Sequence, residues 1–231
     1  PQKGEDQTMT DGSELTMLAG PRFGPVSGNT PKQLVILLHG RGANGDDLIG
    51  LAPHLAQALP DAAFMAPNAP HDSEMGFGFQ WFAGGPDADA ATKLGQIRET
   101  AELVNAFIDE ELGKLGLSDD RLALVGFSQG TMMSLFVGPR RDSPCAGIMG
   151  FSGRLESPDV LARELKCRPP VVLVHGDADP VLPANMMTDA AAALSENGFE
   201  VSSHIRPGLG HGIDEEGLRI GVEFLGRVLG D

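Results

Sequence analysis

The chain has 231 residues, of which 41% are hydrophobic and 21% are charged. These fractions are typical of a globular protein and argue against a disordered, collagenous or coiled-coil chain. The 32 acidic residues outnumber the 17 basic ones, so the formal net charge is −15, a sign that repels nucleic acid phosphates and anionic lipid headgroups. No apolar run approaches the roughly 18 residues of a membrane span. We therefore expect a soluble chain without a nucleic acid partner or a membrane span.

Residues 1–33 are rich in Gly, Pro, Thr and Ser, and they contain the turn signal Asp11-Gly12 between two short strand-like stretches. This segment predicts an N-terminal arm or hairpin that belongs to the same domain as the rest of the chain. The first residues are polar and lack the apolar core of a signal peptide, so the expected location is cytoplasmic. Cys145 and Cys167 lie in no C-x-x-C motif and are expected to be reduced structural thiols.

From residue 34 onward, short continuous apolar runs alternate with segments of helical periodicity. Runs without polar alternation are typical of strands buried on both faces of a parallel sheet. With right-handed crossovers, this order predicts an α/β fold in which residues 34–231 form a single domain, a doubly wound, mostly parallel sheet with helices on both faces. The runs span residues 34–38, 62–66, 122–125, 148–151 and 171–174, with a strand-like stretch at 201–205 and helical faces at 48–59, 94–112 and 218–229.

One of these runs leads into a candidate nucleophile. After the third run the chain continues as Gly126-Phe127-Ser128-Gln129-Gly130 and then enters a helix-like segment. Ligands of such sheets bind beyond the carboxyl ends of the strands, where a strained turn exposes the serine. The close approach of strand and helix then requires glycine two residues before and two residues after the serine. Ser128 is the predicted nucleophile, and the alternative is a glycine-bounded turn with an idle serine.

A serine hydroxyl needs a base to take its proton and a carboxylate to orient that base. Three histidines follow Ser128 in the chain. His175 begins a turn after an apolar run, and His204 lies in a strand-like stretch. His211 lies instead in the glycine-rich loop 208–212, from which an imidazole can reach the serine. His211 is therefore the predicted base.

The acid is expected in the loop after the preceding strand, which holds two aspartates. Asp177 lies next to the strand end and suits a turn former that accepts hydrogen bonds from its own backbone amides. Asp179 lies further out, is fixed by Pro180, and is better placed to reach His211. The spacing favours Asp179 and leaves Asp177 open.

The oxyanion formed by such a serine requires at least two preoriented N–H donors. One predicted donor is the backbone amide of Gln129, at the start of a helix whose dipole favours negative charge. The other is the backbone amide of Arg41, in the glycine-rich turn 39–45. That turn lacks the Lys-Ser/Thr ending of a P-loop and the G-x-G-x-x-G spacing of a dinucleotide site. We expect no cofactor and no metal.

Four motifs of the chain, in the same order, resemble those of the phospholipase/carboxylesterase family of α/β-hydrolases, which includes bacterial carboxylesterases and the acyl-protein thioesterases. The resemblance covers about residues 34–229. It implies the α/β-hydrolase fold, a triad of Ser128, Asp179 and His211, and an oxyanion hole formed by the amides of Arg41 and Gln129. The second aspartate of the D-x-D-P stretch is the catalytic one in that family. The motifs are Leu38-His39-Gly40, Gly126-Phe127-Ser128-Gln129-Gly130, His175-Gly176-Asp177-Ala178-Asp179-Pro180-Val181 and Gly210-His211-Gly212.

The long loop 67–87 holds several aromatic side chains, which can wall a substrate pocket or seal the edge of the domain. Its Trp81-Phe82 pair resembles the W-F pair that the family carries in this region, which favours the pocket. We predict Trp81, Phe82 and Leu182 as substrate-binding residues. Many relatives have an apolar residue after His-Gly, whereas this chain has Arg41.

The predicted function is that of a serine carboxylesterase that hydrolyses a small-molecule ester through an acyl-enzyme on Ser128. A thioesterase or a lysophospholipase would use the same triad and differ in leaving group and pocket length. A non-catalytic binding protein on the same fold is the alternative from another class, although such proteins typically lose a member of the triad.

Overall fold

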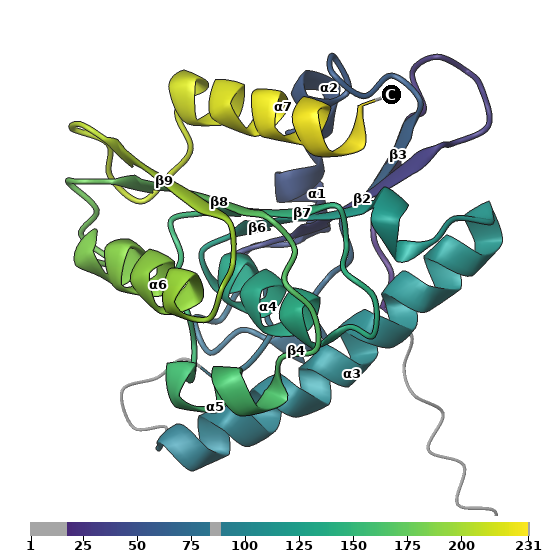
Figure 1. Ribbon diagram of the computed structural model, residues 1–231. Coiled ribbons are helices and arrows are strands. Elements are labelled where there is room, and N and C mark those ends of the chain that lie inside the picture. The colour runs from purple at the N-terminus through teal and green to yellow at the C-terminus, as the bar shows by residue number, and fades with distance from the viewer. Residues whose placement is uncertain (1–17, 84–88, 231) are drawn as a thin grey trace, which may run out of the picture.

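The computed structural model describes residues 18–83 and 89–230, which are organised around a seven-stranded sheet (Figure 1). The strands are β1 (Arg22–Phe23), β2 (Gln33–Leu38), β3 (Ala62–Met65), β6 (Leu122–Phe127), β7 (Gly147–Phe151), β8 (Val171–Gly176) and β9 (Val201–Arg206), beside a separate ribbon of β4 (His71–Asp72) and β5 (Phe79–Gln80). The order in the sheet is β1-β3-β2-β6-β7-β8-β9. All neighbouring strands in it are parallel except the antiparallel pair β1 and β3.

Helices cover both faces of this sheet, as Figure 1 shows. One face carries α1 (Gly45–Ile49), α2 (Ala52–Leu55) and α7 (Glu215–Leu229), and the other carries α3 (Ala90–Leu115), α4 (Gln129–Val137), α5 (Pro158–Glu164) and α6 (Asn185–Glu196). Short 3-10 turns at Asp119–Arg121 and Gly138–Arg140 precede β6 and follow α4. The predicted α/β architecture with a mostly parallel sheet is confirmed. Within the described ranges, no helix combines the length and apolar character that crossing a bilayer requires.

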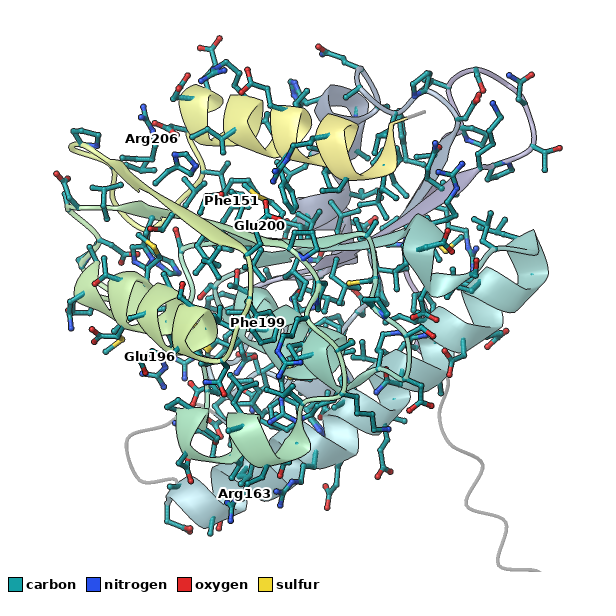
Figure 2. The ribbon with its side chains drawn as sticks, in the orientation of Figure 1. Phe151, Arg163, Glu196, Phe199, Glu200 and Arg206 are labelled. Atoms are coloured by element: carbon teal, nitrogen blue, oxygen red, sulfur yellow. The ribbon has the colours of Figure 1, made fainter. Side chains whose placement is uncertain are left out.

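The central strands are buried because their alternate side chains enter two separate apolar layers. In β2, Leu34 and Ile36 belong to the layer that contains residues of α3 and α4, whereas Val35 belongs to the layer that contains residues of α1, α2 and α7. The two layers are visible in Figure 2, in which Phe151 lies on the α7 side of the sheet and Phe199 on the α6 side. Burial on both faces explains why the sequence of these strands shows apolar runs without polar alternation.

The periodic segment 48–59 does not form one helix. It contributes to the short helices α1 and α2, with Pro53 in the first turn of α2. A proline has no N–H to donate to the carbonyl four residues earlier, so the helix ends near Ile49 and a new one begins. The sequence did not predict β1, the β4–β5 ribbon, α5 or α6. The hairpin predicted around Asp11-Gly12 lies outside the described residues.

An ion pair attaches β1 to helix α3. Arg22 donates from Nη1 and Nη2 to the two carboxylate oxygens of Glu111 at 2.7 and 2.6 Å. The Glu111 side chain is only 2% exposed, and its second cation is Lys114, at 2.9 Å. The hydrogen bond from Arg22 is the largest influence on the pKa of Glu111, which lies below its ordinary value although burial opposes the change. The pair therefore keeps a buried carboxylate ionised.

Replacing Arg22 by glutamine is expected to lower the free energy of unfolding by about 1–2 kcal/mol at pH 7, because Glu111 loses two charge-assisted hydrogen bonds. A lowered folded-state pKa contributes stability above the ordinary pKa of 4.5 and loses it as the pH falls through the lowered value. The difference in the free energy of unfolding between the variant and the wild type should therefore decrease at acidic pH. Urea unfolding at several pH values measures it.

Arg219→Gln is the matched control, since Arg219 pairs with Glu216 and Glu223 on the exposed surface of α7. We expect that substitution to cost less than about 0.5 kcal/mol. Equal losses at pH 7 for the two variants would contradict a stabilising role for the Arg22–Glu111 pair.

Candidate active site

Ser128 lies in the turn between β6 and α4 in a backbone conformation that side chains rarely adopt, with φ 53° and ψ −116°. Neighbouring glycines permit this turn. A Cβ atom on Gly126 would lie 2.4 Å from the nitrogen of Thr131, and one on Gly130 would lie 1.7 Å from the carbonyl oxygen of Leu38. Both contacts are sterically forbidden, so the predicted need for glycine on each side of Ser128 is confirmed.

Loops after two other strands bring a histidine and an aspartate to this serine. His211 Nε2 lies 3.0 Å from Ser128 Oγ, and His211 Nδ1 lies 2.7 Å from Asp179 Oδ2. An ionised carboxylate only accepts hydrogen bonds, so Nδ1 carries the proton and Nε2 is free to accept from the serine hydroxyl. The ring of Phe127 packs against the imidazole, with centroids 5.1 Å apart. The structure thus brings together the three side chains that the sequence predicted as a triad.

Asp179 is 8% exposed and is held by its own loop. Its Oδ1 accepts hydrogen bonds from the amides of Val181 and Leu182 at 2.8 and 2.9 Å, while Oδ2 faces His211. Burial acts to raise the pKa of Asp179, but the hydrogen bonds from Leu182, His211 and Val181 together outweigh it and leave the pKa below its ordinary value. The carboxylate is therefore ionised at neutral pH.

Asp177, the alternative acid, makes a different contact. Its Oδ1 accepts a hydrogen bond from the amide of Gly208 at 2.6 Å. The bond joins the loop after β8 to the loop that carries His211, rather than closing a turn on the amides next to Asp177. Ser152, which was not predicted from the sequence, supports the same loop by donating from Oγ to the carbonyl of Gly212 at 3.1 Å.

His175 belongs to β8 rather than to the turn after it, and its side chain is fully buried. Nε2 lies 2.9 Å from the carbonyl oxygen of Leu182 and 3.1 Å from Asp179 Oδ2. Both neighbours are acceptors, so Nε2 carries a proton. Nδ1 has no partner among the described residues. His175 therefore supports the loop that contains Asp179 and Leu182. His204 lies in β9, as predicted.

The turn after β2 lies against the serine, since a Cβ on Gly40 would be 3.3 Å from Ser128 Cβ. In this turn, the buried His39 accepts a hydrogen bond at Nε2 from the amide of Ala69, at 3.0 Å, and its Nδ1 lies 2.8 Å from the carbonyl oxygen of Gly40. These partners fix the Nδ1–H tautomer. Because a trans peptide places C=O and N–H on opposite sides, the bond to the Gly40 carbonyl turns the N–H of Arg41 away from His39.

The two predicted oxyanion donors have no hydrogen-bond partner in the part of the chain that the structure describes. Within residues 18–83 and 89–230, neither the amide of Arg41 nor that of Gln129 donates a hydrogen bond. The Gln129 side chain is engaged instead, since Oε1 accepts from the amide of Trp81 at 2.8 Å and Nε2 donates to the carbonyl of Phe82 at 2.7 Å. Gln129 thereby attaches the aromatic loop to the start of α4 while its own N–H stays available.

A cavity of about 350 Å³ opens in front of Ser128 and His211. Phe82 and Leu182 line it, as predicted, but Trp81 does not. The indole of Trp81 is fully buried, and its Nε1 donates to the carbonyl of His39 at 2.8 Å. Trp81 thus supports the turn after β2 from the core side. Six further lining residues were not predicted from the sequence, namely Met75, Lys93, Met132, Arg154, Glu156 and Val181.

Comparison with known proteins identifies the family of this chain. The chain matches the Phospholipase/Carboxylesterase family over residues 26–229. It belongs to that family. Its members include esterases and thioesterases, so the chain is a member of a hydrolase family with the α/β-hydrolase fold.

Individual relatives differ in their names. Acyl-protein thioesterase 1 of Kluyveromyces lactis is 28% identical over 213 residues, which cover 86% of this chain and 92% of that protein. Esterase YpfH of Escherichia coli is 27% identical over 197 residues, which cover 84% and 82%. The crystal structure of esterase PE8 is similar at a TM-score of 0.87 and 38% identity, covering 92% of this chain and all of that one (100%). The Bacillus cereus carboxylesterase, at a TM-score of 0.76 and 16% identity over 93% of this chain and 96% of that one, shares the fold.

His39 provides a test of the turn geometry. Burial lowers the pKa of His39 below its ordinary value of 6.5, so the folded protein should keep this imidazole neutral at pH values where an exposed histidine is protonated. The unfolded chain takes up the proton first, so this group makes the protein less stable as the pH falls below 6.5. We expect imidazole ¹H–¹⁵N correlation spectra, assigned with His39→Gln, to show the Nδ1–H tautomer. An Nε2–H tautomer would contradict the assigned orientation of the Gly40–Arg41 peptide.

Proposed function

We propose that this protein is a serine carboxylesterase that cleaves small-molecule carboxylic esters through an acyl-enzyme on Ser128. The observation that carries the proposal is the continuous path of hydrogen-bond distances from Ser128 Oγ through His211 to Asp179, at the mouth of a cavity. A serine in an idle turn would not need this strained backbone, and it would have no oriented base beside it.

In the proposed reaction, Ser128 Oγ attacks the ester carbonyl carbon while its proton passes to His211 Nε2. Asp179 stabilises the imidazolium through the Nδ1–H bond. The negative charge on the carbonyl oxygen is met by the unpaired amides of Arg41 and Gln129. When the tetrahedral intermediate collapses, the C–O bond to the alcohol breaks and the alcohol leaves with the proton from His211. Water then attacks the acyl-enzyme by the same route, which releases the carboxylic acid and restores Ser128.

A thioesterase is the second candidate, because several relatives are named acyl-protein thioesterase. We favour an oxygen ester because the 38% identity to esterase PE8 exceeds the 28% identity to the Kluyveromyces lactis thioesterase. Turnover of an oxygen ester and a thioester of the same acyl chain separates the two candidates. A location in the cytoplasm remains a prediction.

Replacing Ser128 by alanine should reduce kcat by on the order of 10⁶, as in comparable triads, because the nucleophile is removed. Alanine keeps the Cβ in the same strained turn, so we expect an unchanged melting temperature within about 2 °C. A fluorophosphonate probe should label the wild type and not the variant. Retention of more than a few per cent of activity in the variant would refute the acyl-enzyme on Ser128.

The two aspartates should respond differently to the same change. In Asp179→Asn, the amide group facing His211 favours the wrong imidazole tautomer, and kcat should fall by about 10⁴ at neutral pH. In Asp177→Asn, an amide oxygen can still accept from Gly208, so we expect less than a tenfold change in kcat and a loss of about 1 kcal/mol of stability. Measuring kcat and melting temperature for both variants tests this. The reverse result would make Asp177 the acid.

A further inference from the structure

The pocket in front of Ser128 carries the opposite charge from the rest of the chain. Among its described lining residues, three side chains are cationic, Arg41, Lys93 and Arg154, and one is acidic, Glu156. In the whole chain, by contrast, the 32 acidic residues outnumber the 17 basic ones. A basic pocket on a strongly acidic protein attracts an anionic ligand to the pocket, whereas the remaining surface repels it.

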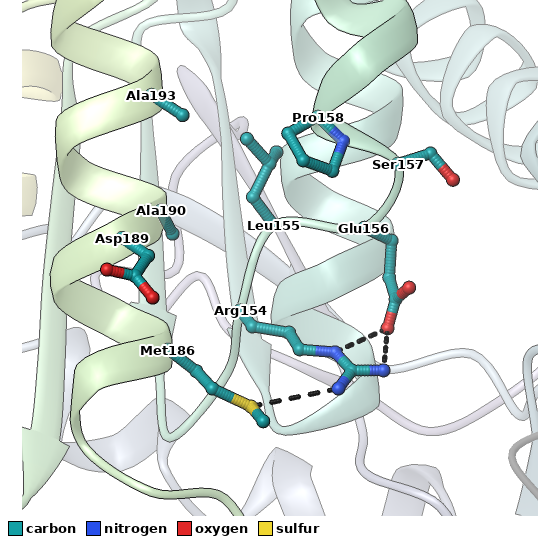
Figure 3. A pocket seen from close by; sticks show the side chains of 9 residues that line it. All are labelled: Arg154, Leu155, Glu156, Ser157, Pro158, Met186, Asp189, Ala190 and Ala193. Atoms are coloured by element: carbon teal, nitrogen blue, oxygen red, sulfur yellow. Dashed lines mark hydrogen bonds and ion pairs between the residues drawn. The ribbon is translucent and has the colours of Figure 1, made fainter. Parts of the chain in front are cut away.

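One of these cations is already neutralised. Arg154 Nε and Nη2 each lie 2.6 Å from Glu156 Oε1, and Nη1 lies 3.7 Å from the sulfur of Met186 (Figure 3). The Glu156 side chain is 9% exposed. The pair forms a wall shared by the catalytic pocket and a second cavity of about 290 Å³ between α5 and α6. It shapes the pocket and adds no net charge.

Arg41 and Lys93 are the uncompensated cations of the pocket. Within the described part of the chain, neither side chain forms a hydrogen bond or an ion pair. Asp89, one turn before Lys93 on α3, is already engaged, because its carboxylate accepts from the amides of Ala91 and Thr92 and from the Thr92 hydroxyl. Both cations therefore remain available to a ligand in front of the nucleophile.

We propose that Arg41 and Lys93 select esters that carry an anionic group close to the ester bond that is cleaved. The inference rests on the proposed function, whose reaction it does not change. A carboxylate on the substrate would be attracted by two cations several ångströms away, whereas the net charge of −15 would repel it everywhere else on the surface. A preference for the anionic substrate would therefore have to originate in the pocket.

The test compares matched esters that differ in one charge. The first pair is mono-p-nitrophenyl adipate and its methyl diester, which place the charge on the acyl side. The second pair is 4-(butyryloxy)phenylacetate and its methyl ester, which place it on the alcohol side. We expect the anionic member of at least one pair to have a kcat/KM about tenfold higher at 10 mM ionic strength. The preference should fall below about threefold in 0.5 M NaCl, because salt screens the attraction.

Two variants locate the origin of the preference. The double variant Arg41→Gln, Lys93→Gln keeps both backbone amides and should bring the ratio of kcat/KM values between the paired esters to about one or below. Using the ratio cancels any change in catalysis that is common to both esters. Lys166→Gln is the matched control, because Lys166 is exposed, pairs with Asp142, and precedes β8 at the amino ends of the parallel strands, whereas Ser128 follows β6 at their carboxyl ends. That variant should leave the ratio unchanged.

The outcomes separate the two proposals. If both esters of each pair are hydrolysed and the neutral ones are equally good or better at low salt, the anionic preference is overturned and the hydrolase proposal stands. Retention of the preference in the double variant also overturns it. If none of the esters is hydrolysed and the fluorophosphonate probe does not label Ser128, both proposals fail.

Discussion

The close approach of α4 to the sheet is the constraint on which the site depends. Gly130 lies so near the backbone of Leu38 that no side chain fits between them. The chain must therefore turn from β6 into α4 at a single residue, and Ser128 makes this turn with a φ of 53°. Strain of this kind costs about 1–3 kcal/mol. The buried helix α4 and the bond from the amide of Ser128 to the carbonyl of Phe151, at 2.8 Å, offset it. Packing of the fold, rather than contacts of its own side chain, thus positions the serine.

The same packing organises the side of the site that holds the two predicted oxyanion donors. Gln129 binds the backbone of Trp81 and Phe82, the indole of Trp81 binds the carbonyl of His39, and His39 binds the carbonyl of Gly40. These groups are buried, and a buried polar group without a partner would be costly, so each bond constrains the next. The result is a rigid connection from the start of α4 to the turn after β2. Both unpaired amides lie at its ends.

The sequence predicted those features that local sterics decide. Glycines on both sides of Ser128 reflect a contact that any such strand, turn and helix must make, and the apolar runs reflect burial on both faces of the sheet. The spacing alone favours Asp179 without excluding Asp177, because only the folded loop shows which carboxylate faces His211. Trp81 was predicted to line the pocket, but it is buried in the core instead. The sequence does not distinguish these two positions, because an aromatic residue on a loop can face either a cavity or the core.

Other features carry no local signal in the sequence. Lys93 comes from α3, and Arg154 comes from the segment after β7, so only the folded chain places them beside Ser128. The break between α1 and α2 does have a local signal, Pro53, although the apolar periodicity of residues 48–59 continues across it.

The pair of Asp179 and His211 shows how a buried carboxylate remains ionised. Burial alone would raise the pKa of Asp179 and weaken it as a partner for an imidazolium. Two of the three hydrogen bonds that reverse this effect come from backbone amides of the same loop, those of Val181 and Leu182. The carboxylate is thus supported independently of His211. In the proposed reaction, the positive charge that appears on His211 then meets a carboxylate that is already ionised and fixed in place, so no reorganisation of the loop is needed during proton transfer.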